Sequence, residues 1–402
     1  MSAASNPFKA SLGSSPRFLA GRQEEIEEFA MALDDGPGAH ERISLVTGLR
    51  GIGKTVLLNE FEDQAKARSW WVLSETATAG FVQRLKDSVY RLIEEHFPSS
   101  SHYLSGVSLP LGGGGVQRAE KSAYSPETTL REAITQLLEL QAAQDERLGQ
   151  DPVGLLITID ELHHYRRDEV VEFGAVIQHL VRENREIAVA MAGIPQSVRP
   201  LLASDEGRNP VTFLRRANRM DLGLIAEADV REALEQPVEA VGCSWSDEGL
   251  DAAVEACEGY PFMIQLVGHQ SFRQKKGDCI DAEVVAAGAD KARRKLGQLV
   301  HEPALADLSD VDRTFLAAMA VDDGPSAMAD LAERLHASAQ YAGGYRRRLI
   351  GAEMIKSTGY GKVDFELPYM REYLRKHVIV DALGGYVNES SEPSASNAEQ
   401  AE

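Results

Sequence analysis

The glycine-rich segment GLRGIGKT, residues 48–55, constrains the fold of this chain more than any other feature. It directly follows RISLVTG, a short run rich in β-branched residues, and it opens a stretch with helical periodicity over residues 54–67. A loop of this kind between a strand and a helix is the context that the phosphate-binding pattern GxxxxGK, followed by Ser or Thr, requires. The segment therefore predicts a parallel sheet of alternating strands and helices, with this loop at the end of one strand.

The chemistry of a nucleotide phosphate explains the spacing within this loop. Gly51 and Gly53 let backbone N–H groups converge on phosphate oxygens without a Cβ in the way. The helix that follows directs its positive dipole end at the same anion. Lys54 is expected to neutralise the β- and γ-phosphates of ATP, and the Thr55 hydroxyl to ligate Mg²⁺. The expected nucleotide contacts are Gly48, Arg50, Gly51, Ile52, Gly53, Lys54, Thr55 and Val56.

Strand and helix patterns continue to alternate as far as residue 193. Strands are predicted at residues 42–48, 69–77, 153–160 and 186–193, and helices at residues 23–33, 54–67, 81–97, 128–147 and 168–183. The run VGLLITID is apolar almost throughout, as expected of a central parallel strand that is buried on both faces. It delivers Asp160, expected to hold Mg²⁺, and Glu161, expected to orient and deprotonate the attacking water. The sequence therefore predicts an α/β fold with an ATP-hydrolysing site at one edge of its sheet.

Composition limits the other classes of function. The formal net charge of −20, from 42 basic and 62 acidic residues, excludes a general nucleic-acid coat protein. No apolar run reaches the roughly 18 residues that a membrane span needs, so no membrane partner is expected. The N-terminal segment lacks the apolar region of a signal peptide. The three cysteines, Cys243, Cys257 and Cys279, form no CxxC pair, which favours free thiols and a cytoplasmic location.

Together, the two acidic residues and the phosphate loop make residues 17–376 resemble the additional-strand P-loop ATPases. The segment FLAGRQEEIEEF is similar to the GR-x-x-E segment that lies beside the adenine in AAA+ proteins of the origin-recognition and archaeal-initiator type and in related STAND ATPases. The resemblance implies an AAA+-like P-loop NTPase core over residues 17–225 and a helical lid over residues 226–300. Residues 98–125 are expected to form an inserted loop, and residues 1–16 and 388–402 to be disordered.

The resemblance also implies three further site residues. In AGIPQ, Gln196 occupies the position of a polar residue that faces the γ-phosphate. In FLRRA, Arg216, with Arg215 in reserve, matches an arginine finger that acts in trans within a homo-oligomer. In EGYPF, Pro261 matches a proline that packs against the adenine. The alternatives are a plain turn, solvated arginines and an ordinary helix start. The lid arginine of the initiators is missing, which implies slow, switch-like hydrolysis of ATP to ADP and phosphate.

Residues 305–378 change in pattern and are expected to form a winged helix. Helices are predicted at residues 308–320 and 327–335. A turn and the recognition helix are expected within residues 337–355, followed by a two-stranded wing at residues 356–368. Eight basic and four acidic residues give residues 341–377 a net charge of +4 in an acidic chain. This segregation favours a surface that faces phosphates. The candidate contacts with double-stranded DNA are Tyr345, Arg346, Arg347, Arg348 and Lys362.

Two functions remain open at this point. The first is an ATPase that uses its winged helix to engage DNA in a nucleotide-dependent way. The second is a STAND-like regulatory switch whose winged helix docks protein and whose arginines are simply solvated. No sensor or effector domain is visible after residue 378, which favours the first function.

Overall fold

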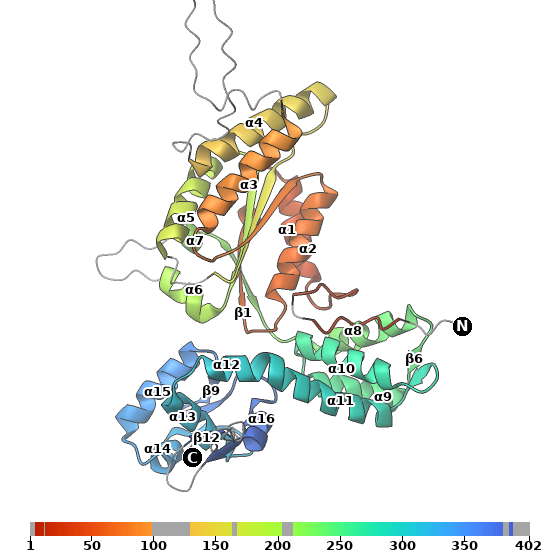
Figure 1. Ribbon diagram of the computed structural model, residues 1–402, viewed down its shortest axis with the longest axis vertical. Helices are drawn as coiled ribbons and strands as arrows, with labels where there is room; N and C mark the ends of the chain where they lie inside the picture. Colours follow the sequence, from red (N-terminus) through yellow and green to blue (C-terminus); the bar gives the residue numbers. More distant parts are fainter. Residues whose placement is uncertain are drawn as a thin grey trace, which may run out of the picture. The chain divides into compact units, whose positions relative to one another are not determined.

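The computed structural model describes residues 5–11, 13–98, 129–162, 167–202, 212–380 and 386–388. The chain divides into two compact units (Figure 1). The sheet unit comprises Arg22–Gly48 and Gly53–Gly223, and the helical unit comprises Met1–Gly21, Leu49–Ile52 and Leu224–Glu402. Residues 99–125 of the expected inserted loop and residues 389–402 of the expected tail lie outside the described residues.

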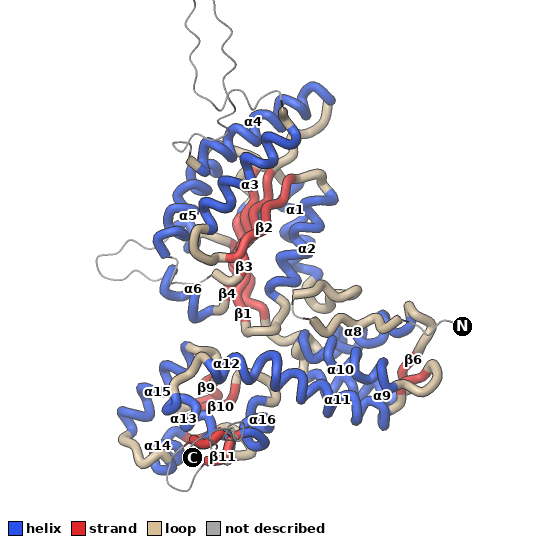
Figure 2. The backbone as a smooth tube through the Cα atoms, in the orientation of Figure 1, coloured by secondary structure: helices blue, strands red, loops and turns tan. Residues whose placement is uncertain are grey.

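A five-stranded parallel sheet forms the centre of the sheet unit (Figure 2). Its strands are β1 (Ile43–Gly48), β2 (Trp71–Thr76), β3 (Leu155–Asp160), β4 (Ile187–Gly193) and β5 (Asn218–Leu222). Their order is β2-β3-β4-β1-β5, and each neighbouring pair is parallel, which confirms the predicted α/β class. No strand is predicted from the sequence at β5, and this is wrong: β5 is an edge strand in which only Met220 and Leu222 are buried.

Helices cover both faces of this sheet. On one face lie α1 (Gln23–Asp34) and α2 (Lys54–Ala67), and on the other lie α3 (Phe81–His96), α4 (Leu130–Leu148) and α5 (Arg167–Arg182) (Figure 1). The short elements are η1 (His40–Arg42), α6 (Pro195–Leu202) and α7 (Thr212–Arg215). A capping box between Thr129 and Glu132 fixes the start of α4, because each side chain bonds the other residue's backbone N–H.

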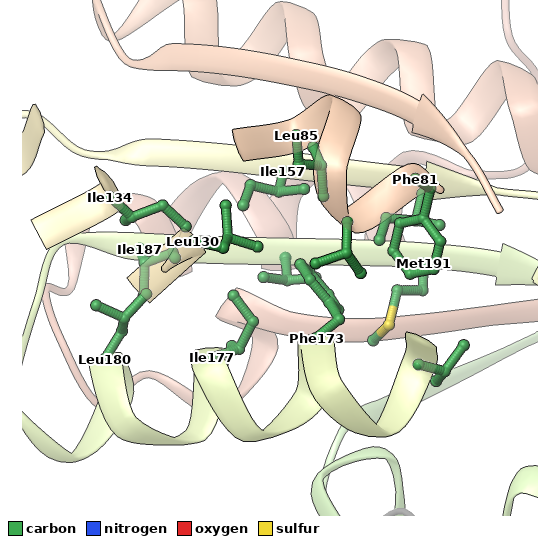
Figure 3. Close-up of a cluster of buried hydrophobic side chains, with 14 of the residues drawn as sticks. Phe81, Leu85, Leu130, Ile134, Ile157, Phe173, Ile177, Leu180, Ile187 and Met191 are labelled. Carbon is green, nitrogen blue, oxygen red and sulfur yellow. The ribbon is translucent and has the colours of Figure 1, made fainter. Parts of the chain in front are cut away.

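The hydrophobic core of the sheet unit lies between the sheet and helices α3 to α5. Alternate residues of β3, among them Ile157, point into this layer, as the period of a strand requires. The rings of Phe81 and Phe173 meet edge to face with their centroids 5.9 Å apart (Figure 3). This packing fixes β3 in the middle of the sheet, and β3 in turn carries the acidic pair that follows it.

The first part of the helical unit contains four helices. They are α8 (Glu227–Glu239), α9 (Asp247–Cys257), α10 (Pro261–Gln274) and α11 (Ala282–Leu296). The expectation of a helical lid over residues 226–300 lacks one detail, because β6 (Ser244–Trp245) and β7 (Cys279–Ile280) pair in parallel there. All three cysteines of the chain are free, with Cys243 and Cys257 buried.

The N-terminal segment is anchored on this unit. Phe8 is only 4 % exposed, and its ring lies where a Cβ at Gly268 would stand. The Asn6 side-chain amide donates to the carbonyl of His269 at 3.0 Å. The expectation that residues 1–16 are disordered is therefore wrong for residues 5–11, because one aromatic side chain and the polar groups beside it have partners on α10.

A second group of elements follows in the helical unit. It begins with the π-helical turn η4 (Gly297–His301). The helices are α12 (Glu302–Ala306), α13 (Asp310–Ala320), α14 (Met328–Arg334), α15 (Ala339–Gly351) and α16 (Met370–His377). The strands are β8 (Ser326–Ala327), β9 (Ile355–Gly359), β10 (Lys362–Phe365), β11 (Val378–Val380) and β12 (Tyr386–Asn388). The sheet β8-β10-β9 is antiparallel. The Ser309 hydroxyl caps α13, as the sequence predicts. None of the helices within the described ranges is long and apolar enough to cross a membrane.

Candidate nucleotide-binding site

The predicted phosphate loop joins β1 to α2. Gly48 ends β1, and Lys54, Thr55 and Val56 form the first turn of α2. Gly53, at φ 100°, is the N-cap of α2, and no side chain among the described residues caps this helix. The first backbone N–H groups of α2 are therefore available to an anion, as a phosphate site requires.

The structure brings together the two residues predicted to bind Mg²⁺. The Thr55 hydroxyl donates to Oδ2 of Asp160 at 2.6 Å, although 105 residues separate them in the sequence. The Lys54 ammonium donates to the carbonyl of Gly48 at 2.7 Å. A hydroxyl and a carboxylate are the hard oxygen ligands that Mg²⁺ takes beside substrate phosphates. Among the described residues no cluster of three or more His, Cys, Asp or Glu that could hold a metal ion is found.

Glu161 follows β3 directly. Its backbone adopts φ 54°, in the left-handed region that residues other than glycine rarely adopt. Its backbone N–H donates to the carboxylate of Asp160 at 2.8 Å, and its own side chain is exposed. Strained conformations of this kind gather at functional sites. Asp160 is half-buried whereas Glu161 is exposed, and their roles as metal ligand and base stay predictions.

Gln196 lies in the first turn of α6, after β4. Because β4 stands between β1 and β3 in a parallel sheet, α6 begins at the same sheet edge as the ends of β1 and β3. The side chain of Gln196 itself lies outside what the structure describes. The backbone thus brings this candidate to the predicted edge, and its role stays a prediction.

Arg216 lies near the amino ends of the parallel strands, opposite the carboxyl ends where the phosphate loop lies. It precedes β5, whose Asn218 pairs with Ser44 of β1, whereas Gly48 is four residues further along β1. At about 3.3 Å per residue, the start of β5 is roughly 13 Å from the phosphate loop of the same chain. Arg216 is exposed and lines a cavity of about 250 Å³, together with Arg182. The role of Arg216 as an arginine finger that acts in trans stays a prediction.

The reserve candidate, Arg215, has a structural partner. Its Nε donates to the carbonyl of Leu202, near the end of α6, at 2.6 Å. No partner for the side chain of Arg216 is found among the described residues. The choice of Arg216 over Arg215 as the candidate arginine finger stays a prediction.

Pro261 is the first residue of α10, and its neighbour Tyr260 is a residue that the sequence pattern does not single out. Tyr260 is fully buried, and its hydroxyl donates to the carbonyl of Arg50, inside the phosphate loop. A cavity of about 620 Å³ in the helical unit is lined by Gly259 but not by Pro261. Nothing local in the sequence Gly-Tyr-Pro indicates that its tyrosine contacts a loop 210 residues away.

The candidate DNA contacts divide into two groups. Arg347 on α15 and Lys362 on β10 are exposed, and no partner of either side chain is found among the described residues. Arg346 donates to the hydroxyl of Ser357 at 2.9 Å. Arg348 instead donates through Nε to Asp312 at 2.8 Å, and its guanidinium lies 4.3 Å from the ring centroid of Tyr345.

Two more of the eight basic residues within residues 341–377 have partners on helix α13. Arg371 donates to the carbonyl of Met319 at 3.1 Å, and Arg375 donates to the carbonyl of Ala320 at 2.5 Å. Both therefore satisfy the end of α13, where backbone carbonyls lack helical partners. Arg348, Arg371 and Arg375 thus have partners within the fold, and the interpretation of the basic excess as a phosphate-facing surface stays a prediction.

Comparisons with known proteins agree with this fold. Residues 19–189 match the AAA ATPase domain family, and residues 298–374 match a domain of unknown function (DUF8462). The solved structure of a Walker-type ATPase of Pyrococcus abyssi aligns with a TM-score of 0.61 at 15 % identity, over 91 % of this chain and 99 % of its own. Residues 19–189 thus resemble an AAA ATPase domain, and the chain shares its fold with a Walker-type ATPase.

Two further solved structures align with lower scores. The Orc1 protein of Aeropyrum pernix, in complex with DNA, has a TM-score of 0.41 at 17 % identity, over 90 % of this chain and 94 % of its own. A variant of the Thermotoga maritima RuvB protein has a TM-score of 0.44 at 14 % identity, over 89 % of this chain and 95 % of its own. No curated protein matches the sequence.

Proposed function

We propose that the protein binds Mg·ATP at the loop of residues 48–55 and slowly hydrolyses it to ADP and phosphate. The observation that carries this proposal is the hydrogen bond between Thr55 and Asp160 at 2.6 Å, beside Lys54 at the start of α2. It unites two predicted motifs that are far apart in sequence. The proposed organisation is an ATPase core over residues 17–225 and a lid over residues 226–300.

Each residue at this edge has a proposed task. Lys54 neutralises charge on the β- and γ-phosphates, and Thr55 and Asp160 hold the metal. Mg²⁺, when bound there, supplies further charge neutralisation on the same oxygens. Glu161 accepts a proton as the water oxygen bonds to the γ-phosphorus and the bond to the β–γ bridging oxygen breaks. Gln196 orients the γ-phosphate. The start of α10 offers Tyr260 and Pro261 in place of an arginine, which supports slow turnover.

Nucleotide titrations of Lys54→Ala test this proposal. Loss of the ammonium should raise the Kd for ATP and ADP by at least tenfold, because a charge-assisted contact contributes about 1.5–3 kcal/mol. Lys66→Ala is the matched control, since Lys66 lies on the same helix but is exposed and pairs with Asp63. If a folded Lys54→Ala protein binds nucleotide as tightly as Lys66→Ala does, the loop is not the site.

We further propose that residues 305–378 form a winged helix that engages double-stranded DNA in a nucleotide-dependent way. The order of helices α13, α14 and α15, followed by the hairpin β9–β10, supports it, as do the exposed Arg347 and Lys362. Filter binding of labelled duplex with ATP, ADP or no nucleotide tests it. Binding that changes with the nucleotide is the expected result.

The internal pairing of Arg348, Arg371 and Arg375 favours one second candidate. Only part of the local charge is free for phosphates, and the whole chain is acidic. A regulatory switch whose winged helix docks protein needs no larger basic surface. If the duplex does not bind at low salt in any nucleotide state, this second function replaces the first.

A further inference from the structure

Tyr260 is one of the most firmly anchored side chains of the helical unit. It is 0 % exposed and forms the N-cap of α10. Its backbone N–H donates to the carbonyl of Cys257 at 2.9 Å, and its own carbonyl accepts from the N–H of Met263 at 2.9 Å. The preceding carbonyl, of Gly259, accepts from the N–H of Ile225 at 2.8 Å. These bonds fix the backbone from which the ring projects.

The hydroxyl of the Tyr260 ring donates to the carbonyl of Arg50. Burial raises the pKa of the Tyr260 hydroxyl, so the group stays protonated and remains a donor at all working pH values. A buried hydroxyl without a partner is costly, so this bond has a strong reason to persist. The carbonyl that it binds belongs to the third residue of GLRGIGKT.

Peptide geometry passes this constraint to the next residue. In a planar trans peptide, the C=O and the following N–H point in opposite directions. A donor that holds the carbonyl of Arg50 therefore also fixes the N–H of Gly51, on the side away from Tyr260. A Cβ at Gly51 would lie 2.9 Å from Cζ of Tyr260 and nearer still to the hydroxyl oxygen, and the φ of Gly51 is +74°. Only glycine permits this approach.

A second contact reaches the same loop residue from the helical unit. The guanidinium of Arg50 pairs with Asp307 at 3.0 Å, but the two side chains are 45 % and 67 % exposed. Exposed ion pairs contribute little to stability. Of the two contacts, the buried hydrogen bond of Tyr260 is the one expected to control the loop.

We infer that Tyr260 is a positioning residue that holds the peptide between Arg50 and Gly51 in its phosphate-binding orientation, and so links nucleotide binding to the lid helix α10. This inference rests on the proposed nucleotide site. The N–H of Gly51 serves the α- and β-phosphates that ATP and ADP share. Loss of the tyrosine hydroxyl therefore affects both nucleotides alike, whereas a residue that senses the γ-phosphate affects ATP alone.

Tyr260→Phe tests the inference because it removes one oxygen and keeps the ring. The loop then spends less time in its competent orientation, and the apparent affinity falls by that fraction. We expect the Kd values for ATP and ADP to rise about three- to tenfold, because the loss of one hydrogen bond changes a binding constant by about that factor. The KM for ATP should rise similarly, and kcat at saturating ATP should stay within about twofold, because ground state and transition state lose the same contact.

Tyr369→Phe is the matched control. The Tyr369 hydroxyl also donates to a backbone carbonyl of the helical unit, that of Ala256 at 3.0 Å, and that carbonyl belongs to α9 rather than to the loop. Both variants lose one tyrosine hydroxyl bond, so both should melt at a slightly lower temperature. Only Tyr260→Phe should lose nucleotide affinity and show faster amide hydrogen exchange in residues 48–55.

The outcomes separate this inference from the proposed function. If wild-type protein binds no nucleotide, or Lys54→Ala binds it normally, the proposed site itself is wrong. If wild type binds, Lys54→Ala does not, and Tyr260→Phe binds both nucleotides like wild type, only the positioning role is overturned. An equal loss of affinity in Tyr369→Phe, or a loss confined to ATP in Tyr260→Phe, also overturns it.

Discussion

Arg347 and Arg348 are adjacent on α15, and the structure gives them opposite expected phenotypes. The side chain of Arg348 is 52 % exposed, but it pairs with the carboxylate of Asp312, which is only 5 % exposed. Arg348→Ala leaves this carboxylate with the Ser309 hydroxyl, which donates to it at 2.6 Å. Removal of one partner from a buried pair costs about 3–5 kcal/mol. Because the arginine is half-exposed and Ser309 remains, we expect about 1–3 kcal/mol here.

Arg347→Ala removes an exposed side chain, so the stability should stay within about 0.5 kcal/mol of wild type. If Arg347 neutralises a phosphate, the slope of log affinity against log salt should shrink by up to about 0.9. Arg348→Ala should lower the melting temperature and leave that slope unchanged at temperatures where the protein is folded. Thermal unfolding and a salt titration of duplex binding measure the two effects. Equal changes of slope, or a destabilised Arg347→Ala, would refute the assignment.

Three further predictions concern hydrolysis, assembly and pH. Glu161→Gln should keep ATP affinity but abolish phosphate release, and normal turnover would assign the base elsewhere. The activity of wild type per molecule should rise with protein concentration, and Arg216→Ala, but not Arg215→Ala, should remove that rise; activity independent of concentration contradicts a role in trans. Burial lowers the pKa of His301 to about 4, below its usual 6.5. The unfolded chain therefore binds the extra proton first, and stability should fall as the pH drops from 6.5 towards 4, by up to about 1.4 kcal/mol per unit. Melting curves should show a smaller decline in His301→Gln.

The site at the end of the sheet could be predicted because each of its parts is local in sequence. The loop of residues 48–55 is recognised by its glycine spacing, and β3 is recognised by an apolar run that Asp160 and Glu161 follow. The rule that parallel strands end at one edge then brings Thr55 and Asp160 together without further information. β5 escaped prediction because an edge strand buries few side chains, and the polar residues of NRMDL lack the continuous apolar pattern of β3.

Tyr260 could not be found in the same way. In sequence it is an aromatic residue at a helix start, where Pro261 is also ordinary. Its contact with Arg50 depends on how the lid packs, and no periodicity or spacing encodes a pairing across 210 residues. The one sign of this contact in the sequence is the glycine at position 51, and phosphate binding already explains a glycine there. The structure adds a second reason for a glycine there, which is the approach of the tyrosine ring.

The basic C-terminal segment shows why a charge count predicts a surface poorly. Counting treats each arginine as free, but a guanidinium can also complete a fold by donating to carbonyls that a helix end leaves unpaired. Arg371 and Arg375 do this at the end of α13, and Arg348 neutralises the carboxylate of Asp312 in its first turn. These partners of the three arginines lie outside residues 341–377, so the net charge of that segment does not reflect these contacts. An arginine's contribution to phosphate binding therefore has to be judged from its partners, and by that measure Arg347 is the arginine of its run whose charge is most available.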